Sequence, residues 1–178
     1  MNRFRSLAAS FLALAPAVAA QGKPDLLWLG GGHDDIRGAA ITPDEQTLVT
    51  CGFSDETVKL WDVPSGMLRN TLNASIGGVT AIALSPDGTT VLSGSDVAFG
   101  SGDPLIKRWR VSDGALIQTY DTGEFHAIES LAFSSDGTRF AAAMSDHATV
   151  FDVASGAALA TFTGHSFTVF SVAFSPNG

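Results

Sequence analysis

A four-residue turn signal recurs along the 178-residue sequence and constrains the fold more than any other feature. Successive copies begin 43, 49 and 41 residues apart, and they read TPDE (42–45), SPDG (85–88), SSDG (134–137) and SPNG (175–178). In the second copy, proline presets the backbone angle of a type I turn and glycine suits the exit from it. A turn that recurs in this way predicts a chain built from internal repeats.

A second marker lies between the turn signals and repeats in phase with them. It reads VKLWDVPSG (58–66), IKRWRVSDG (106–114) and TVFDVASG (149–156). Counting from Trp61, Trp109 and Phe151, a glycine follows five residues later and a threonine ten residues later in every copy. The two markers together place the repeating units at about residues 30–72, 73–120 and 121–162, with a partial unit at 163–178.

Each unit contains several short apolar runs that predict β-strands. The runs before the turn signals are IRGAAI, VTAIAL, IESLAF and VFSVAF, which are too short for helices. With the strand after the turn, the tryptophan strand and the run that follows it, each unit has four strands. A single four-stranded sheet of about 42 residues cannot bury both of its faces, whereas such sheets stack around an axis as the blades of a β-propeller. The predicted fold class is therefore all-β.

The first twenty residues have the layout of a secretory signal peptide. MNRFR carries two arginines and no acid, and an apolar run that ends in small residues follows it. The run is too short and too rich in alanine for a membrane span. We expect cleavage after Ala19 or Ala20, export to the periplasm or the extracellular space, and no membrane span in the mature domain at 21–178. A buried N-terminal helix is the alternative.

The charge of the remaining chain argues against nucleic acid as a partner. The full sequence carries a formal net charge of −8, and loss of Arg3 and Arg5 leaves 8 basic against 18 acidic residues. No basic patch survives in such a composition. Cys51 is the single cysteine, so no internal disulfide can form, and we expect it to pack as a small apolar residue.

No catalytic or metal-binding pattern emerges from the sequence. The four histidines lack the spacing of zinc ligands. Asp96 and Asp103 lie in the long loop 96–105, where a calcium site is the alternative to a solvated turn, which we favour. The sequence has no G-x-S-x-G elbow and no phosphate-binding loop after a strand. Asn73 begins a glycosylation sequon, which matters only in a host that glycosylates exported proteins. We predict no catalytic residue, no cofactor and no metal.

The repeats resemble those of WD40-repeat β-propeller proteins in GHSFTVFSVAFSPNG, TVKLWDVPSG and GGVTAIALSPDG, and the resemblance covers essentially all of residues 25–178. It implies a hydrogen-bonded network in each blade, formed by a histidine, a serine or threonine, an aspartate and the tryptophan. The structural residues that it implies are His33, Asp55, Trp61, Ser93, Trp109, Asp146 and His165. It also implies that every unit departs from the full set, with Cys51 in place of serine in the first, Ser75 in place of histidine in the second, and Glu124, Ala142 and Phe151 in the third.

The resemblance also implies a function and a binding surface. In this family, the loops between the second and third strands share a face with the loops that hold the glycine-histidine pair, and partners commonly bind there. The expected partner-binding residues on this loop face are Asp34, Asp35, Phe99, Asp103, Phe125 and Phe167. An exposed aromatic side chain anchors many interfaces, although each phenylalanine here can equally cap the core. We expect an exported, non-enzymatic scaffold for a protein partner. The alternatives are a propeller enzyme and a sensor domain whose catalytic part lies beyond residue 178.

The two ends of the sequence predict an incomplete ring. The last residues contain only the first strand and first turn of a fourth unit, and DLLWL (25–29) precedes GGGH as an outer strand does in the later units. In the family, such an N-terminal strand usually completes the last blade. We therefore expect a truncated sequence with about three and a half blades of a seven-bladed ring.

Overall fold

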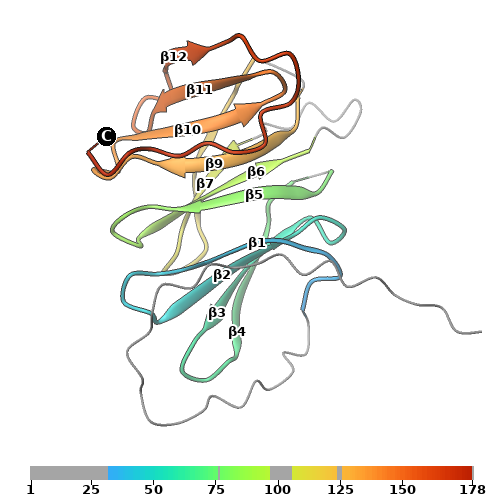
Figure 1. Ribbon diagram of the computed structural model, residues 1–178. Helices are drawn as coiled ribbons and strands as arrows, with labels where there is room; N and C mark the ends of the chain where they lie inside the picture. Colours follow the sequence, from blue (N-terminus) through green and yellow to red (C-terminus); the bar gives the residue numbers. More distant parts are fainter. Residues whose placement is uncertain (1–31, 76, 97–105, 124–125, 178) are drawn as a thin grey trace, which may run out of the picture.

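The computed structural model describes residues 32–75, 77–96, 106–123 and 126–177. These residues form three four-stranded antiparallel sheets, and in each the strands lie side by side in chain order (Figure 1). The first sheet consists of β1 (Ile36–Ile41), β2 (Thr47–Gly52), β3 (Thr57–Asp62) and β4 (Leu68–Asn73). The second consists of β5 (Val79–Leu84), β6 (Thr90–Ser95), β7 (Ile106–Arg110) and β8 (Leu116–Tyr120). The third consists of β9 (Ile128–Phe133), β10 (Arg139–Met144), β11 (His147–Asp152) and β12 (Ala158–Phe162).

The recurring turn signal joins the first two strands of every sheet. In the second sheet the amide of Gly88 donates to the carbonyl of Ser85 at 2.8 Å, which closes the turn. Gly88 and Gly137 leave their turns with φ of 70°. This left-handed region is open to glycine at no steric cost. The first sheet has Glu45 at the same place with φ of 60°, so an L-residue adopts the conformation that glycine takes in the other two.

The sheets stack face to face like the blades of a propeller, with the first sheet lowest and the third uppermost in Figure 1. The apolar cores lie between sheets. One cluster joins the first and second sheets through residues that include Cys51, Leu72 and Trp109. The other joins the second and third sheets through residues that include Tyr120 and Phe140. The described sheets do not close into a ring. This arrangement confirms the predicted all-β fold of four-stranded blades in an incomplete propeller.

Close backbone packing holds neighbouring blades together near the innermost strands. The hydroxyl of Thr80 on β5 donates to the carbonyl of Ile128 on β9 at 2.6 Å. A Cβ atom at Gly94 on β6 would lie 2.5 Å from Cγ2 of Ile128, a distance that real side chains do not reach. Glycine at position 94 therefore lets the third blade approach the second.

The predicted strand VFSVAF (169–174) is not a strand in the structure. The segment runs along the third blade, where the amide of Val169 donates to the carbonyl of Ser145 at 2.6 Å and the amide of Val172 donates to Oγ of Ser130 at 3.3 Å. Strand assignment requires a ladder of backbone bonds to a neighbour, and no other described segment pairs with this one. The predicted outer strand at 25–29 lies outside the described residues.

Candidate interaction surfaces

A polar network braces the first blade. His33 Nδ1 lies 2.8 Å from Oδ2 of Asp55, and His33 Nε2 lies 2.8 Å from the hydroxyl oxygen of Thr50. The indole Nε1 of Trp61 donates to the same hydroxyl oxygen at 2.8 Å. The side chain of His33 is only 1% exposed, so its ring depends on these bonds.

The donors and acceptors of the network fix the tautomer of His33. An indole N–H can only donate, so the oxygen of Thr50 accepts from Trp61. The hydroxyl proton of Thr50 is then free to donate to Nε2 of His33, an arrangement that matches the tautomer with its N–H at Nδ1. That N–H donates to the carboxylate of Asp55. Every polar atom in the chain from Trp61 to Asp55 thereby has a partner, which is the condition under which a buried network stabilises a fold.

The order Asp55, His33, Thr50 is that of a catalytic triad, but the arrangement does not support catalysis. Thr50 is 6% exposed, and its oxygen already accepts a bond from Trp61. A nucleophile must reach a substrate carbonyl, and this hydroxyl is enclosed between two side chains. Lys59 Nζ also lies 2.9 Å from Oδ2 of Asp55, so the carboxylate is held on several sides. The network has a structural role.

The prediction that the first blade lacks a complete network was wrong. Thr50, rather than Cys51, occupies the serine position, because Thr50 pairs across the sheet with Lys59 as Ser93 pairs with Lys107. A shift of one residue along a strand moves a side chain to the opposite face. Cys51 accordingly points into the apolar cluster between the first two blades and is fully buried. Its burial raises the pKa of the thiol to about 12.

The second and third blades retain only parts of the network. Trp109 Nε1 donates to Oγ of Ser93 at 2.9 Å, which confirms that predicted pair. Ser75 is 8% exposed where the first blade has histidine. Asp146 lies 3.2 Å from Nδ1 of its neighbour His147 and does not reach a tryptophan. His165 is exposed, and no hydrogen bond of its side chain is present among the residues that the structure describes.

The loop face is defined here by the connections that follow the second strand of each sheet and those that join one blade to the next. On its first blade the guanidinium of Arg37 stacks 5.0 Å above the ring of Phe53 and pairs with Asp35 at 3.0 Å. Asp34 is exposed beside them. Asp34 and Asp35 are among the binding residues expected from the sequence, whereas Arg37 and Phe53 are not. Phe53 follows a predicted strand, so the criterion that singled out other loop phenylalanines could have found it.

Phe167 is the most exposed large apolar side chain among the described residues, at 86%. It follows β12 of the third sheet, whereas Asp34 and Asp35 precede β1 of the first sheet, and these two sheets lie at opposite ends of the stack (Figure 1). Among the predicted binding residues that the structure describes, Asp34 and Asp35 therefore do not share one compact site with Phe167. The other predicted binding residues, Phe99, Asp103 and Phe125, lie outside the described residues. Because Asp103 is one of them, the alternative calcium site of Asp96 and Asp103 also stays a prediction.

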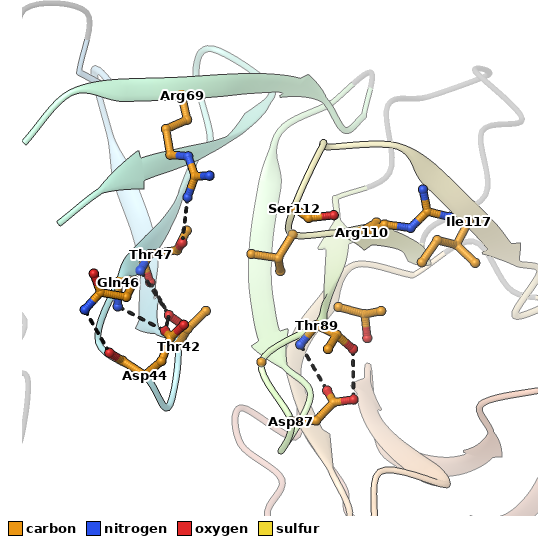
Figure 2. A pocket seen from close by; sticks show the side chains of 13 residues that line it. Thr42, Asp44, Gln46, Thr47, Arg69, Asp87, Thr89, Arg110, Ser112 and Ile117 are labelled. Carbon is orange, nitrogen blue, oxygen red and sulfur yellow. Dashed lines mark hydrogen bonds between the residues drawn. The ribbon is translucent and has the colours of Figure 1, made fainter. Parts of the chain in front are cut away.

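The opposite face, called the turn face here, carries the turns after the first and third strands of each sheet. A cleft of about 530 Å³ opens there between the first and second blades (Figure 2). Arg69 points across the first blade to the hydroxyl of Thr47, to which it donates at 3.2 Å, and Arg110 pairs with Asp113 at 2.8 Å. A second cleft of about 500 Å³ lies between the second and third blades.

Carboxylates at the rims of these clefts are bonded within their own turns. Asp87 accepts from the hydroxyl of Ser85 at 2.6 Å and from the amide of Thr89 at 3.0 Å, and these bonds hold its pKa below the usual value. Asp136 in the third blade accepts from Ser134 and Thr138 in the same way, which lowers its pKa to about 2. Both carboxylates therefore remain charged at neutral pH and serve first to close their turns.

Two negative findings concern the part of the chain that the structure describes. It contains no group of three or more histidine, cysteine, aspartate or glutamate side chains placed to share a metal ion. It also contains no helix with the length and apolar character needed to cross a membrane.

Comparison with known proteins identifies related sequences. The family described as WD domain, G-beta repeat matches residues 26–62, 66–109, 114–151 and 156–178. Autophagy-related protein 16 of Arabidopsis thaliana is 31% identical over 152 residues, which cover 84% of this chain and 28% of that protein. Small ribosomal subunit protein RACK1y of Oryza sativa subsp. japonica is 33% identical over 113 residues, which cover 64% of this chain and 31% of that protein. An uncharacterized WD repeat-containing protein of Synechocystis is 31% identical over 104 residues, 53% of this chain and 30% of that protein. The chain thus spans less than a third of the length of each of these relatives.

Proposed function

This chain belongs to the WD40-repeat family, and we propose on that premise that it is a non-enzymatic scaffold that binds a partner protein through its loop face. WD40 repeats support a role in protein–protein interaction. The relative RACK1y is named as a protein of the small ribosomal subunit, and membership of an assembly agrees with a binding role for the shared repeats.

The observation that carries the proposal is the exposure of Phe167 on the loop face. A phenylalanine ring that is 86% exposed leaves apolar area in water that a partner can cover. The enclosed hydroxyl of Thr50 supports a binding role over a catalytic one, because the triad-like arrangement of Asp55, His33 and Thr50 has no access to substrate.

Loss of a partner on substitution of Phe167 tests the proposal. The tagged 178-residue protein and its Phe167→Ala variant would be used to capture proteins from an extract of the native cells, followed by mass spectrometry. Phe170→Ala is the matched control, because Phe170 is 74% exposed and lies three residues further along the chain. We expect Phe167→Ala to lose a protein that the wild type and Phe170→Ala retain. Identical sets of captured proteins would contradict the use of this face.

We also propose that the protein is exported. The arginine-containing start and the apolar run that follows it support this proposal. Expression in the native host, followed by fractionation and determination of the mature N-terminus, tests it. An N-terminus at residue 20 or 21 outside the cytoplasm is expected, and an uncleaved cytoplasmic protein would contradict it.

A further inference from the structure

Arg108 occupies a position where the repeat otherwise carries an aliphatic side chain. It lies one residue before Trp109, and the corresponding residues before Trp61 and Phe151 are Leu60 and Val150. Leu60 is 1% exposed and packs in the core between the first two blades. A charged side chain therefore stands at a place in the third strand that favours an apolar one.

The guanidinium of Arg108 is poorly satisfied by the protein itself. Nη1 donates to the carbonyl of Val153 at 3.4 Å, but the hydroxyl of Tyr120 donates to the same oxygen at the shorter distance of 2.8 Å. Nη2 donates to Oε1 of Gln118 at 3.3 Å, and Nε is buried without a partner. Both bonds are near the upper limit for a hydrogen bond, and no carboxylate among the described residues forms an ion pair with this side chain.

Partly buried cations are normally paired, because removal of a charge from water costs free energy that a counter-charge must offset. Arg69 and Arg110 in the neighbouring cleft are exposed to solvent, whereas Arg108 is only partly exposed. The charge at position 108 therefore has no direct ion pair among the described residues, and only the more distant carboxylates of Asp87 and Asp136 line the same cleft. A residue that departs in this way from the aliphatic type of the other repeats is a candidate for binding a ligand.

Arg108 lines the 500 Å³ cleft between the second and third blades on the turn face. A cleft of this volume admits one or two side chains of an extended peptide. Phe133 and the turn residue Ser135 contribute to its walls, and Asp87 and Asp136 are also among its lining residues. Both carboxylates are ionised, so their negative charge repels a doubly charged anion more strongly than a single carboxylate.

We propose that this cleft binds an extended segment of a partner protein by seating the carboxylate of one aspartate or glutamate side chain against Arg108. Planar guanidinium groups bind carboxylates in a bidentate manner, and such charge-assisted bonds are stronger than the two long neutral bonds that Arg108 makes here. The site lies on the turn face and does not depend on the loop face that carries the proposed scaffold function. The protein would then have two binding faces.

The experiment uses the ¹⁵N-labelled 178-residue protein and two blocked peptides, acetyl-Leu-Glu-Leu-amide and its glutamine counterpart. The peptides have the same shape and differ in one charge. We expect the glutamate peptide to shift the backbone resonances of Thr138 and Val153, which are bonded to each other beside the cleft, in a saturable manner. The affinity of the glutamine peptide should be at least about tenfold lower than that of the glutamate peptide. Free glutarate, tested at the same concentrations, should bind more weakly than the glutamate peptide, since it lacks the flanking leucines.

The variant Arg108→Leu separates a binding role from a structural one. It restores the residue type found at Leu60 and removes a poorly paired charge, so we expect the Tm to stay the same or rise while binding of the glutamate peptide is lost. Arg110→Ala, at an exposed arginine two residues away, should leave binding unchanged.

A clear fall in Tm for Arg108→Leu would show that the charge is structural and would overturn the proposal. The proposal would also be overturned if the two peptides bound equally well, or if Arg108→Leu bound the glutamate peptide as tightly as the wild type does. Glutarate binding as tight as that of the glutamate peptide would overturn it too. None of these outcomes bears on capture through Phe167.

Discussion

The hydroxyl of Thr50 joins His33 and Trp61, because its oxygen accepts a hydrogen bond from the indole N–H at 2.8 Å and lies 2.8 Å from Nε2 of the imidazole. Substitution by valine keeps the shape and removes both bonds. We expect Thr50→Val to lower the free energy of unfolding by about 1–3 kcal/mol, because two buried polar groups lose their partner. Urea denaturation measures the change.

Thr90→Val is the control for that measurement. Thr90 lies on β6, is partly buried, and makes no side-chain hydrogen bond in the described structure. Its substitution should change the free energy of unfolding by less than about 0.5 kcal/mol. Equal losses in the two variants would mean that the network contributes nothing specific.

Protonation of Asp55 should make the first blade sensitive to acid. Burial acts to raise the pKa of this carboxyl, but hydrogen bonds from Lys59, His33 and Thr57 outweigh it, and the net pKa lies below 3.8. A folded-state pKa below the unfolded one stabilises the protein above the unfolded pKa, and this contribution is lost as the pH falls through the folded pKa. The difference in unfolding free energy between wild type and Asp55→Asn should therefore be constant near pH 7 and shrink below about pH 4. A difference that grows on acidification would be inconsistent with this account.

The thiol of Cys51 should be unreactive in the folded protein. Its pKa of about 12 leaves almost no thiolate at neutral pH, and the side chain is fully buried. Iodoacetamide at pH 8 should alkylate Cys51 only in urea, and intact-mass spectrometry measures the extent. Rapid alkylation of the native protein would show that the interface between the first two blades opens readily.

Glu45 should be a site where glycine stabilises the protein. It holds φ of 60° at the place where Gly88 and Gly137 hold 70°. The left-handed conformation costs an L-residue about 1–2 kcal/mol, and the greater freedom of glycine in the unfolded chain offsets part of the gain. We expect Glu45→Gly to raise the free energy of unfolding by up to about 1 kcal/mol, and thermal denaturation measures it.

The matched variant Gly137→Ala should act in the opposite direction. A Cβ atom there would meet Cδ of Pro86 at 3.4 Å, which is an ordinary contact, so the penalty comes from the backbone conformation alone. If both variants shifted stability with the same sign, the backbone argument would fail.

The architecture was predictable because its signals are local and recur. Proline, aspartate and glycine in the turns, with apolar runs on either side, predicted the strand pattern of all three sheets, and the structure confirms it. The network in the first blade was not predictable to the residue. Thr50 and Cys51 are adjacent, and only the cross-strand register decides which of them faces Trp61. A hydroxyl and a thiol are both acceptable in a buried strand, so neither residue type revealed the register.

Features that depend on contact between distant residues were also beyond sequence reasoning. Phe53, which follows β2, meets Arg37 on β1 only in the folded sheet, and no local sequence pattern joins them. Arg108 shows no anomaly until it is aligned with Leu60 and Val150 and its surroundings are known. Segment 169–174 carries a strand pattern, but whether it forms a strand depends on a neighbour to pair with.

The position of the two apolar clusters between blades, rather than within them, has a consequence for synthesis on the ribosome. The first cluster draws on residues from Val49 to Val111, and the second on residues from Ala81 to Val153. Val91 belongs to one cluster and its neighbour Leu92 to the other, so β6 faces both. As the chain emerges from its N-terminus, the core against the first blade is incomplete until Trp109 and Val111 leave the exit tunnel. We therefore expect each newly completed sheet to complete the apolar core of the sheet made before it.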